Sequence, residues 1–502
     1  MVLLFTHQNS QRVHYIFNEV LSVRLGITFQ ITNDWSFFQV TKAEIKIAYT
    51  DIQTLDTDFK DYLWVYNEGL LMEDFIRDFS MPISKGVYDL QNQSANSEFF
   101  SLPFAQIEAL FLAPTHVNNH TNQPKDDILS KKFIPFDMFS EIFWCISRYE
   151  EYQWEKAISN GETPNINFDN NGQPLPKLIP EDAYGRYPAK QSLLFQNGWL
   201  ETPIVDKLIW LFGHCINQTP LDQFEIIATA DIDMALRYGG RTIITWFGSF
   251  LKDVFLRPNL ILERFKTLVS QKDPYQMDLA TLPILEVAKT HKLFILNHRV
   301  RTDKNKQISS KTLFREIKRI REQFSGGAEN WGLHPSWQSQ LNQTVTKKEW
   351  KWEKTELEKN INTPVKHARL HYIHLKLPGS YQILQEIGIS HDWSMGYPDA
   401  IGFRAGTSKS YLWYDLSQEK YSGLNIHPFC IMDVTCKNYL GLTHNISIEK
   451  SHSIKQSLYL LGGTFCFIFH NESVSNSFPW KGWKNTIIQW VKQPISNPIK
   501  PQ

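Results

Sequence analysis

The chain has 502 residues, and its 52 lysines and arginines equal its 52 aspartates and glutamates in number. A formal net charge of zero removes the electrostatic argument for a nucleic-acid or anionic-membrane partner. The length exceeds what one ordinary hydrophobic core organises, so we expect two domains. The 16 tryptophans, 19 tyrosines and 33 phenylalanines are expected mostly in the core, although aromatic faces also suit sugar rings.

The N-terminus starts with an apolar run but has no basic region and no apolar core of about 7–15 residues, so it does not predict a signal peptide. No apolar stretch reaches the roughly 18 residues of a membrane helix. The five cysteines lack CxxC spacing and predict reduced, mostly buried thiols: Cys145, Cys215, Cys430, Cys436 and Cys466. These features together predict a cytoplasmic protein without a membrane span.

Residues 1–215 mix short alternating strands with helices and polar loops. The expected segments are strands at 27–32 and 43–49, a helix at 138–152, and loops at 114–130 and 155–180. Two polar-aromatic clusters, 147–152 and 183–187, are interpreted as packing and docking segments, with ligand binding as the alternative.

Residues 216–502 repeat one pattern, a short apolar run that ends on an acid, a histidine or an arginine. The runs reach Asp231 and Asp233, Asn297 and His298, His334, Arg369 and His371, Asp392, and His470. Strands buried on both faces read as continuous apolar runs, and a parallel barrel carries its chemistry at the C-terminal strand ends. Helical spacing recurs between the runs, at 308–324, 356–361, 454–461 and 483–491. This alternation predicts a (β/α) barrel with a ring of polar residues at one end.

Asp231 and Asp233 are separated by one residue at a predicted strand end. In an extended strand both side chains point to the same side, so both can face one metal ion or one water. Paired carboxylates raise each other's pKa unless a cation compensates, which lets one act as a base while the other ligates. The alternative is a helix N-cap with a surface partner.

Three further positions carry candidate chemistry. His334 precedes a proline at the end of a buried run and can present its imidazole to a metal, or it merely caps the strand. Arg369 and His371 are expected on one side of a strand, where the arginine can hold a base carboxylate and the histidine can ligate. Their alternative is an exposed arginine and a core histidine. His470 follows the longest apolar strand and is a candidate general acid, or a core histidine with its hydrogen bonds satisfied.

The order Asp-x-Asp, His, Arg, Asp-Trp and His resembles the NodB-homology polysaccharide deacetylases, which are the family-four carbohydrate esterases. A closer likeness to a branch common in Bacteroidetes rests on residues 332–336, 369–372, 392–397, 402–407 and 469–471. Proteins of that branch have an additional N-terminal domain of unassigned function, which residues 136–140, 147–152 and 184–187 resemble.

The resemblance implies an α/β fold with a distorted seven-stranded NodB-like (β/α) barrel at 216–502, preceded by an α+β domain at 1–215. It implies hydrolysis that removes N-acetyl groups from a saccharide and depends on a divalent metal, zinc first, with cobalt, nickel or manganese as alternatives. Carried over by position, Asp231 matches the base, Asp233 and His334 metal ligands, Arg369 the residue that orients the base, Asp392 the carboxylate that tunes the acid, and His470 the acid. We further expect His298, Trp393 and Arg404 to contact substrate.

The chain departs from the family pattern at Gln338, where the second ligand histidine usually stands four residues beyond the first. Amide oxygen is a poor zinc ligand, so His371 or His298 supplies the third ligand, or two residues and water hold the metal. We predict the set Asp233, His334 and His371.

Two functions follow as hypotheses. The first is a deacetylase of an N-acetylated saccharide, such as a precursor of a capsule, lipopolysaccharide or exopolysaccharide. The second is a barrel without metal chemistry that binds a glycan or a partner enzyme. A base, an orienting arginine and an acid together favour the first. Residues 1–215 are expected to support the barrel or shape its groove, because their motifs contain no cluster of metal ligands.

Overall fold

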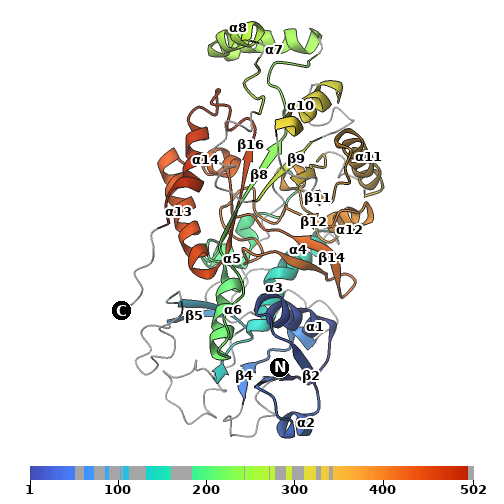
Figure 1. The fold of residues 1–502 in the computed structure, drawn as a ribbon, viewed down its shortest axis with the longest axis vertical. Helices are drawn as coiled ribbons and strands as arrows, with labels where there is room; N and C mark the ends of the chain where they lie inside the picture. The colour runs from blue at the N-terminus through green and yellow to red at the C-terminus, as the bar shows by residue number, and fades with distance from the viewer. Residues whose placement is uncertain are drawn as a thin grey trace.

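The computed structural model describes residues 1–50, 62–72, 85–89, 102, 104, 106–111, 132–159, 182, 184–241, 243–270, 272–277, 290–296, 310–323, 330–337 and 343–495. The expected loop at 114–130, residues 160–180, His298 and Gln338 lie outside the described residues. The described chain is a mixed α/β protein in which the first half and the second half build separate, largely parallel sheets (Figure 1).

The first half contains a five-stranded parallel sheet. Its strands, in spatial order, are β2 (Phe29–Thr32), β1 (Val2–Phe5), β3 (Ile45–Thr50), β4 (Leu63–Tyr66) and β7 (Phe133–Ile134). The apolar start of the chain is therefore an inner strand, and all four residues of β1 are buried. A separate antiparallel pair consists of β5 (Lys85–Asp89) and β6 (Gln106–Leu110). The strands expected at 27–32 and 43–49 are confirmed as β2 and β3.

The helices of this half are α1 (Gln11–Phe17), the π-helix η1 (Asn18–Arg24), α2 (Trp35–Val40), α3 (Met138–Ser147), α4 (Tyr149–Ser159), α5 (Leu193–Gln196) and α6 (Ile204–Cys215). The single helix expected at 138–152 is wrong, because Arg148 adopts a left-handed conformation with φ 56° and separates α3 from α4. The turn directs the buried Arg148 guanidinium to Glu151 and to the hydroxyl of Tyr397. The loop expected from residue 155 also begins too early, since α4 extends to Ser159.

The second half contains a nine-stranded sheet. Its strands, in spatial order, are β13 (Tyr411–Asp415), β14 (Lys420–Ile426), β12 (His391–Asp392), β11 (His367–Ala368), β10 (Trp331–Leu333), β9 (Thr290–Ile295), β8 (Glu225–Ile232), β16 (Thr464–His470) and β15 (Ile431–Met432). Every pair is parallel except β13 with β14. All seven residues of β16 are buried, as expected for a strand covered on both faces. Closure of this sheet into a seven-stranded barrel stays a prediction.

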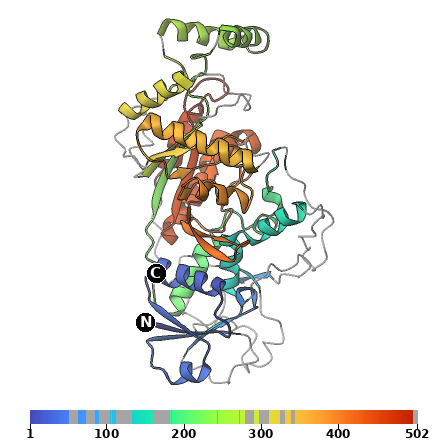
Figure 2. The same ribbon diagram turned by 90° about the vertical axis from the view of Figure 1, so that its right-hand side faces the viewer.

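Helices follow many of these strands along the chain; most of them lie around the sheet, and the first two project beyond it (Figures 1 and 2). They are α7 (Ile243–Leu256), α8 (Asn259–Ser270), α10 (Ser310–Gln323), α11 (Gln343–Ile361), α12 (Gly379–Glu386), the π-helix η11 (Thr435–Tyr439), α13 (His444–Leu461) and α14 (Trp483–Lys492). The helices expected at 308–324 and 483–491 are confirmed as α10 and α14. The segments 356–361 and 454–461 are the C-terminal parts of the longer α11 and α13.

Buried polar contacts connect the two halves. The Arg404 guanidinium pairs with the Glu151 carboxylate, and both side chains are almost completely buried. The Asp206 carboxylate accepts hydrogen bonds from the hydroxyls of Thr407 and Ser408, at 2.6 and 2.7 Å. Gly402 has φ 128°, and a Cβ there would lie 2.3 Å from the Leu200 carbonyl oxygen, so only glycine allows this approach. A domain boundary at residues 215 and 216, between α6 and β8, stays a proposal.

Candidate active site

The candidate site forms where β8 and β16 end side by side. The two strands are parallel and in a register that pairs His470 with Asp231, so the two polar residues that end these apolar runs are neighbours. Asp231 and His470 are 2 % and 8 % exposed. Asp233 follows directly after β8 and is the more accessible carboxylate. The sequence prediction that strand ends gather the chemistry therefore agrees with the geometry of these three residues.

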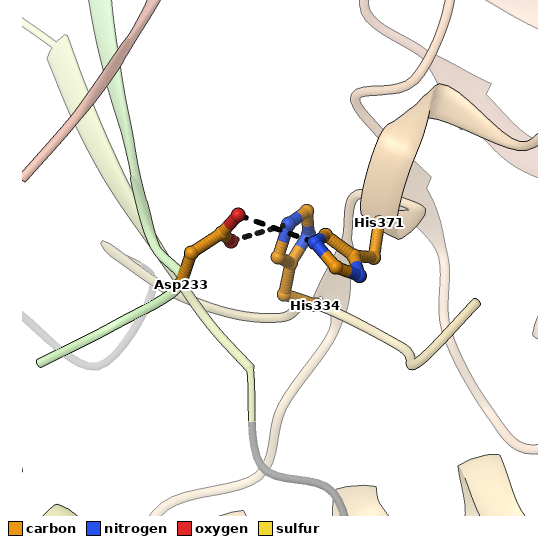
Figure 3. Close-up of side chains that lie close together, drawn as sticks. All are labelled: Asp233, His334 and His371. Carbon is orange, nitrogen blue, oxygen red and sulfur yellow. Dashed lines mark hydrogen bonds and ion pairs between the residues drawn. The ribbon is translucent and has the colours of Figure 1, made fainter. Parts of the chain in front are cut away.

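Two histidines converge on Asp233. His334 Nε2 lies 3.1 Å from Asp233 Oδ1, and His371 Nε2 lies 3.2 Å from Asp233 Oδ2 (Figure 3). One ligand atom from each of the three residues lies within 4.8 Å of the others. In a tetrahedral site with bonds of about 2.0–2.1 Å, ligand atoms are about 3.3 Å apart, which matches the two contacts. Two imidazoles and one carboxylate are a donor set of catalytic zinc sites, which keep a further position for water.

The hydrogen bonding of His334 indicates that Asp233, His334 and His371 fit a cation. Its Nδ1 lies 2.6 Å from the carbonyl oxygen of Arg369, which only accepts, so Nδ1 carries the hydrogen. Burial lowers the pKa of His334, despite the nearby Asp231 and Asp233 carboxylates. The neutral ring then directs the lone pair of Nε2 at a carboxylate oxygen, and a cation between the two atoms relieves that repulsion. The residues present therefore fit a metal ion.

His371 reaches the cluster from a short turn, not from a strand. The sequence placed Arg369 and His371 on one strand, but β11 ends at Ala368 and His371 begins the 3₁₀ turn η10 (His371–Ile373). The next two residues have left-handed backbones, with φ 60° at Tyr372 and 54° at Ile373. Such a conformation is costly for a β-branched residue, typically about 1–3 kcal/mol, and strain of this kind concentrates at functional sites.

Arg369 holds Asp231 beside the cluster. Its Nη1 donates to Asp231 Oδ1 at 2.8 Å, its Nη2 donates to the Thr229 hydroxyl at 2.8 Å, and its Nε donates to the carbonyl of Trp393 at 2.9 Å. The guanidinium is fully buried. The second oxygen of Asp231 lies 3.9 Å from His334 Nε2. Asp231 is thus fixed next to the ligand cluster with one oxygen directed toward it.

His470 is paired with Asp433, which the sequence analysis missed. The His470 Nδ1–H donates to Asp433 Oδ1 at 2.8 Å, and the His470 backbone N–H donates to Asp433 Oδ2 at 2.7 Å. Burial lowers the pKa of His470, but the Asp433 carboxylate, helped by Asp233 and Asp231, outweighs it and raises the pKa to about 10. His470 is therefore protonated at neutral pH.

A cavity of about 320 Å³ opens onto these groups. Its lining residues are Tyr184, Arg186, Asp231, Asp233, His334, His371, Tyr372, Ile373, Pro398, Met432, Val434, Asn438, Tyr439, His470, Glu472 and Trp480. The first half contributes one wall: Tyr184 stacks on Tyr372 with ring centroids 4.9 Å apart, and Arg186 donates to the Tyr372 carbonyl and to the Tyr439 hydroxyl. Tyr184 and Arg186, from a segment interpreted in the sequence as a docking segment, therefore also line the cavity.

Three residues predicted for the site lie elsewhere. The Asp392 carboxylate accepts hydrogen bonds from Ser394 and Tyr381, and none of its hydrogen bonds goes to His470. Trp393 is 2 % exposed and stacks on His427, with centroids 4.1 Å apart. Arg404 is buried against Glu151. None of the three lines the cavity, and the hydrogen-bond partner of His470 is Asp433, not Asp392. Substrate contact by Trp393 and Arg404 stays a prediction.

Comparisons with known proteins leave the activity open. A family of unknown function, DUF7033, matches residues 2–160 and 177–220. No curated protein matches the chain. The solved structure of a candidate polysaccharide deacetylase from Mycobacterium smegmatis is 12 % identical over 53 % of this chain and 83 % of its own, with a TM-score of 0.32. That of 7,8-dihydropteroate synthase from Vibrio fischeri ES114 is 8 % identical over 54 % and 92 %, with a TM-score of 0.24. TM-scores this low carry no weight, so function must be argued from the residues of the site.

Proposed function

We propose that this protein is a metal-dependent hydrolase that removes an N-acetyl group from a saccharide. The observation that carries the proposal is the convergence of Asp233, His334 and His371 in one cavity with a carboxylate held by an arginine and a protonated histidine. A site that only binds a glycan needs no such combination of ligands, base and acid.

Asp233, His334 and His371 are the residues that would hold the metal. When bound, a divalent metal supplies polarisation of the acetyl carbonyl and acidifies a water. We assign Asp231 as the base that takes the proton of the attacking water, because it lies beside the ligands and Arg369 fixes its orientation. The hydrogen bond from Arg369 occupies Oδ1 of Asp231 and leaves Oδ2 toward the cluster.

His470 is assigned as the acid that protonates the amine as the carbon–nitrogen bond breaks. An amine is a poor leaving group without that proton, so the acid must carry it at neutral pH. The Asp433 carboxylate keeps the proton on His470 and fixes the ring through Nδ1, which leaves Nε2 to face the cavity. Asp231 and His470 are neighbours across two strands and so can act on the two ends of one amide bond.

The cavity wall supports a saccharide as the substrate class. Tyr184, Tyr372, Tyr439 and Trp480 line the space near the ligand cluster, and flat aromatic faces pack against sugar rings. Arg186 and Asn438 add hydrogen-bond donors to the same wall.

Acetate release tests the proposal. The full-length protein, loaded with zinc, cobalt, nickel or manganese, is incubated with a panel of N-acetylhexosamine oligosaccharides, and free acetate is measured. We expect acetate release that a chelator abolishes, that added metal restores, and that Asp231→Asn lowers, whereas Glu44→Gln at an exposed carboxylate has no effect. Oligosaccharide binding without acetate release by a metal-loaded protein would instead favour a glycan-binding protein.

A further inference from the structure

The helical hairpin of α7 and α8 projects from the body at the end opposite the first half of the chain (Figures 1 and 2). Ten large apolar side chains are exposed on it: Ile243, Ile244, Phe247, Leu251, Phe255, Leu256, Leu262, Phe265, Leu268 and Val269. Ile243 and Val269 are each 87 % exposed and Phe255 is 79 % exposed. Contiguous exposed apolar surface of this kind marks an interaction site.

The exposed side chains follow helical spacing. On α7 they include positions 243, 247, 251 and 255, and on α8 positions 262, 265 and 269, so each helix presents a continuous apolar stripe. The two helices also contact each other, and Phe265 of α8 takes part, with its ring centroid 6.5 Å from that of Phe250 on α7. Arg264 pairs with Asp253 at 2.5 Å, and its guanidinium lies 5.1 Å from the ring centroid of Trp246. The hairpin is therefore a formed unit whose apolar stripes are left for a partner.

The charges beside the stripes indicate which partner. Lys252, Arg257 and Lys266 are exposed. Each of the two acids within residues 243–270 has a cationic partner of its own, because Asp253 pairs with Arg264 and Glu263 lies 3.8 Å from Arg237. The exposed charge of the hairpin is thus basic, although the chain as a whole has a net charge of zero. An apolar stripe with a basic border fits an anionic lipid surface.

The length of the helices determines whether they lie on a lipid bilayer or cross it. The 14 residues of α7 extend about 21 Å, less than the roughly 30 Å of a bilayer core. Within the described part of the chain, no helix is both long and apolar enough to cross a membrane. We infer that the α7–α8 hairpin binds the surface of an anionic lipid bilayer, with its apolar stripes in the interface and its basic side chains at the headgroups.

Vesicle sedimentation of the full-length protein tests this inference independently of any enzymatic activity. Vesicles of phosphatidylcholine alone are compared with vesicles of an equimolar mixture of phosphatidylcholine and phosphatidylglycerol. We expect binding to the mixed vesicles, weaker binding at high salt, and weaker binding to the neutral vesicles. Phe255→Asn should weaken binding by about tenfold or more, and Lys252→Glu by about fivefold or more.

Val40→Asn is the matched control, because Val40 on α2 is also 79 % exposed but lies in the first half of the chain. Val40→Asn should bind vesicles as the unsubstituted protein does. Neither Val40→Asn nor Phe255→Asn should change the thermal unfolding midpoint, because both side chains are exposed. The inference is overturned by absence of vesicle binding, by equal binding of Phe255→Asn and Val40→Asn, or by equal binding to both vesicle types. The apolar stripes could instead bind a second copy of the chain, which sedimentation velocity tests. A dimer in solution that Phe255→Asn dissociates would assign the stripes to that second copy and overturn the lipid assignment.

Discussion

Replacing Asp433 with Asn should remove the interaction that keeps His470 protonated. Asp433 is fully buried and accepts two hydrogen bonds from His470, one from Nδ1 at 2.8 Å and one from the backbone N–H at 2.7 Å. The neutral amide preserves the shape but not the charge. Because burial lowers the pKa of His470 and Asp433 is the main group that raises it, the pKa should fall from about 10 to its ordinary value of 6.5 or below.

The magnitude follows from these two values. At pH 8 a histidine with a pKa of about 10 is almost fully protonated, whereas one with a pKa of 6.5 carries its proton in about 3 % of molecules. If His470 is the acid, turnover of Asp433→Asn at pH 8 should fall by about thirtyfold and recover as the pH is lowered. The alkaline limb of the pH–rate profile should therefore move down by about 3.5 pH units or more.

The assay is acetate release between pH 5 and 11, together with NMR titration of selectively labelled histidine, in which His470→Gln assigns the signal. Asp392→Asn is the informative control, since Asp392 is the carboxylate that the family pattern pairs with the acid but hydrogen-bonds to Tyr381 and Ser394. A profile that moves with Asp392→Asn and stays unchanged with Asp433→Asn would refute the reasoning.

Three further predictions concern the base, the buried histidines and the contact between the halves. Asp231→Asn should lower turnover by about 10²–10⁴ with metal content nearly unchanged, and turnover equal to the unsubstituted protein would remove Asp231 from the mechanism. Burial and neighbouring cations lower the pKa of His367 to about 2, and burial with its neighbours lowers that of His427 to about 3. Because these folded-state pKa values lie below the unfolded value of 6.5, protons bind the unfolded chain more tightly, and the free energy of unfolding should decrease as the pH falls below 6.5. The expected loss is up to about 1.4 kcal/mol per pH unit for each histidine. Denaturant unfolding at pH 7 and pH 5 measures it, and equal stabilities would contradict the prediction. Arg404→Met leaves the buried Glu151 carboxylate with less compensation and should destabilise the protein by about 3 kcal/mol in denaturant unfolding, whereas a cost under about 0.5 kcal/mol would contradict the account.

The strand-end residues were predictable because their signal is local. Asp231, His334 and His470 each end an apolar run, and parallel strands bring such ends to one edge of a sheet. The neighbouring Asp233 followed from the period of two in an extended strand. His371 was placed in the correct cluster, but the strained turn that carries it has no signature in the sequence.

Asp433 illustrates what sequence order does not encode. It ends the apolar run at 429–432, a signal of the same kind as those at Asp231 and His470, but only the pairing of β15 with β16 shows that it reaches His470. Asp392 was assigned to this role because the family resemblance implies it there. Trp393 and Arg404 lie in the motifs at 392–397 and 402–407, none of whose residues lines the cavity, and their burial depends on contacts with His427 and Glu151 that only the fold supplies.

The α7–α8 hairpin shows that the net charge of the whole sequence does not predict the charge of one surface. Lysine plus arginine equal aspartate plus glutamate over the whole chain, which argued against an anionic surface as a partner. The fold pairs Asp253 with Arg264 and places Glu263 3.8 Å from Arg237, while Lys252 and Lys266 remain exposed. A balance over the sequence therefore conceals a local excess of basic charge.

The central claim is that Asp233, His334 and His371 form a metal site. Its most direct test is the metal content of the purified protein after dialysis with zinc, measured for the unsubstituted chain, for His371→Ala and for Gln338→Ala. The account predicts one metal per chain in the unsubstituted protein and in Gln338→Ala, and a sharply lower content in His371→Ala. Full metal content in His371→Ala with loss in Gln338→Ala would contradict it.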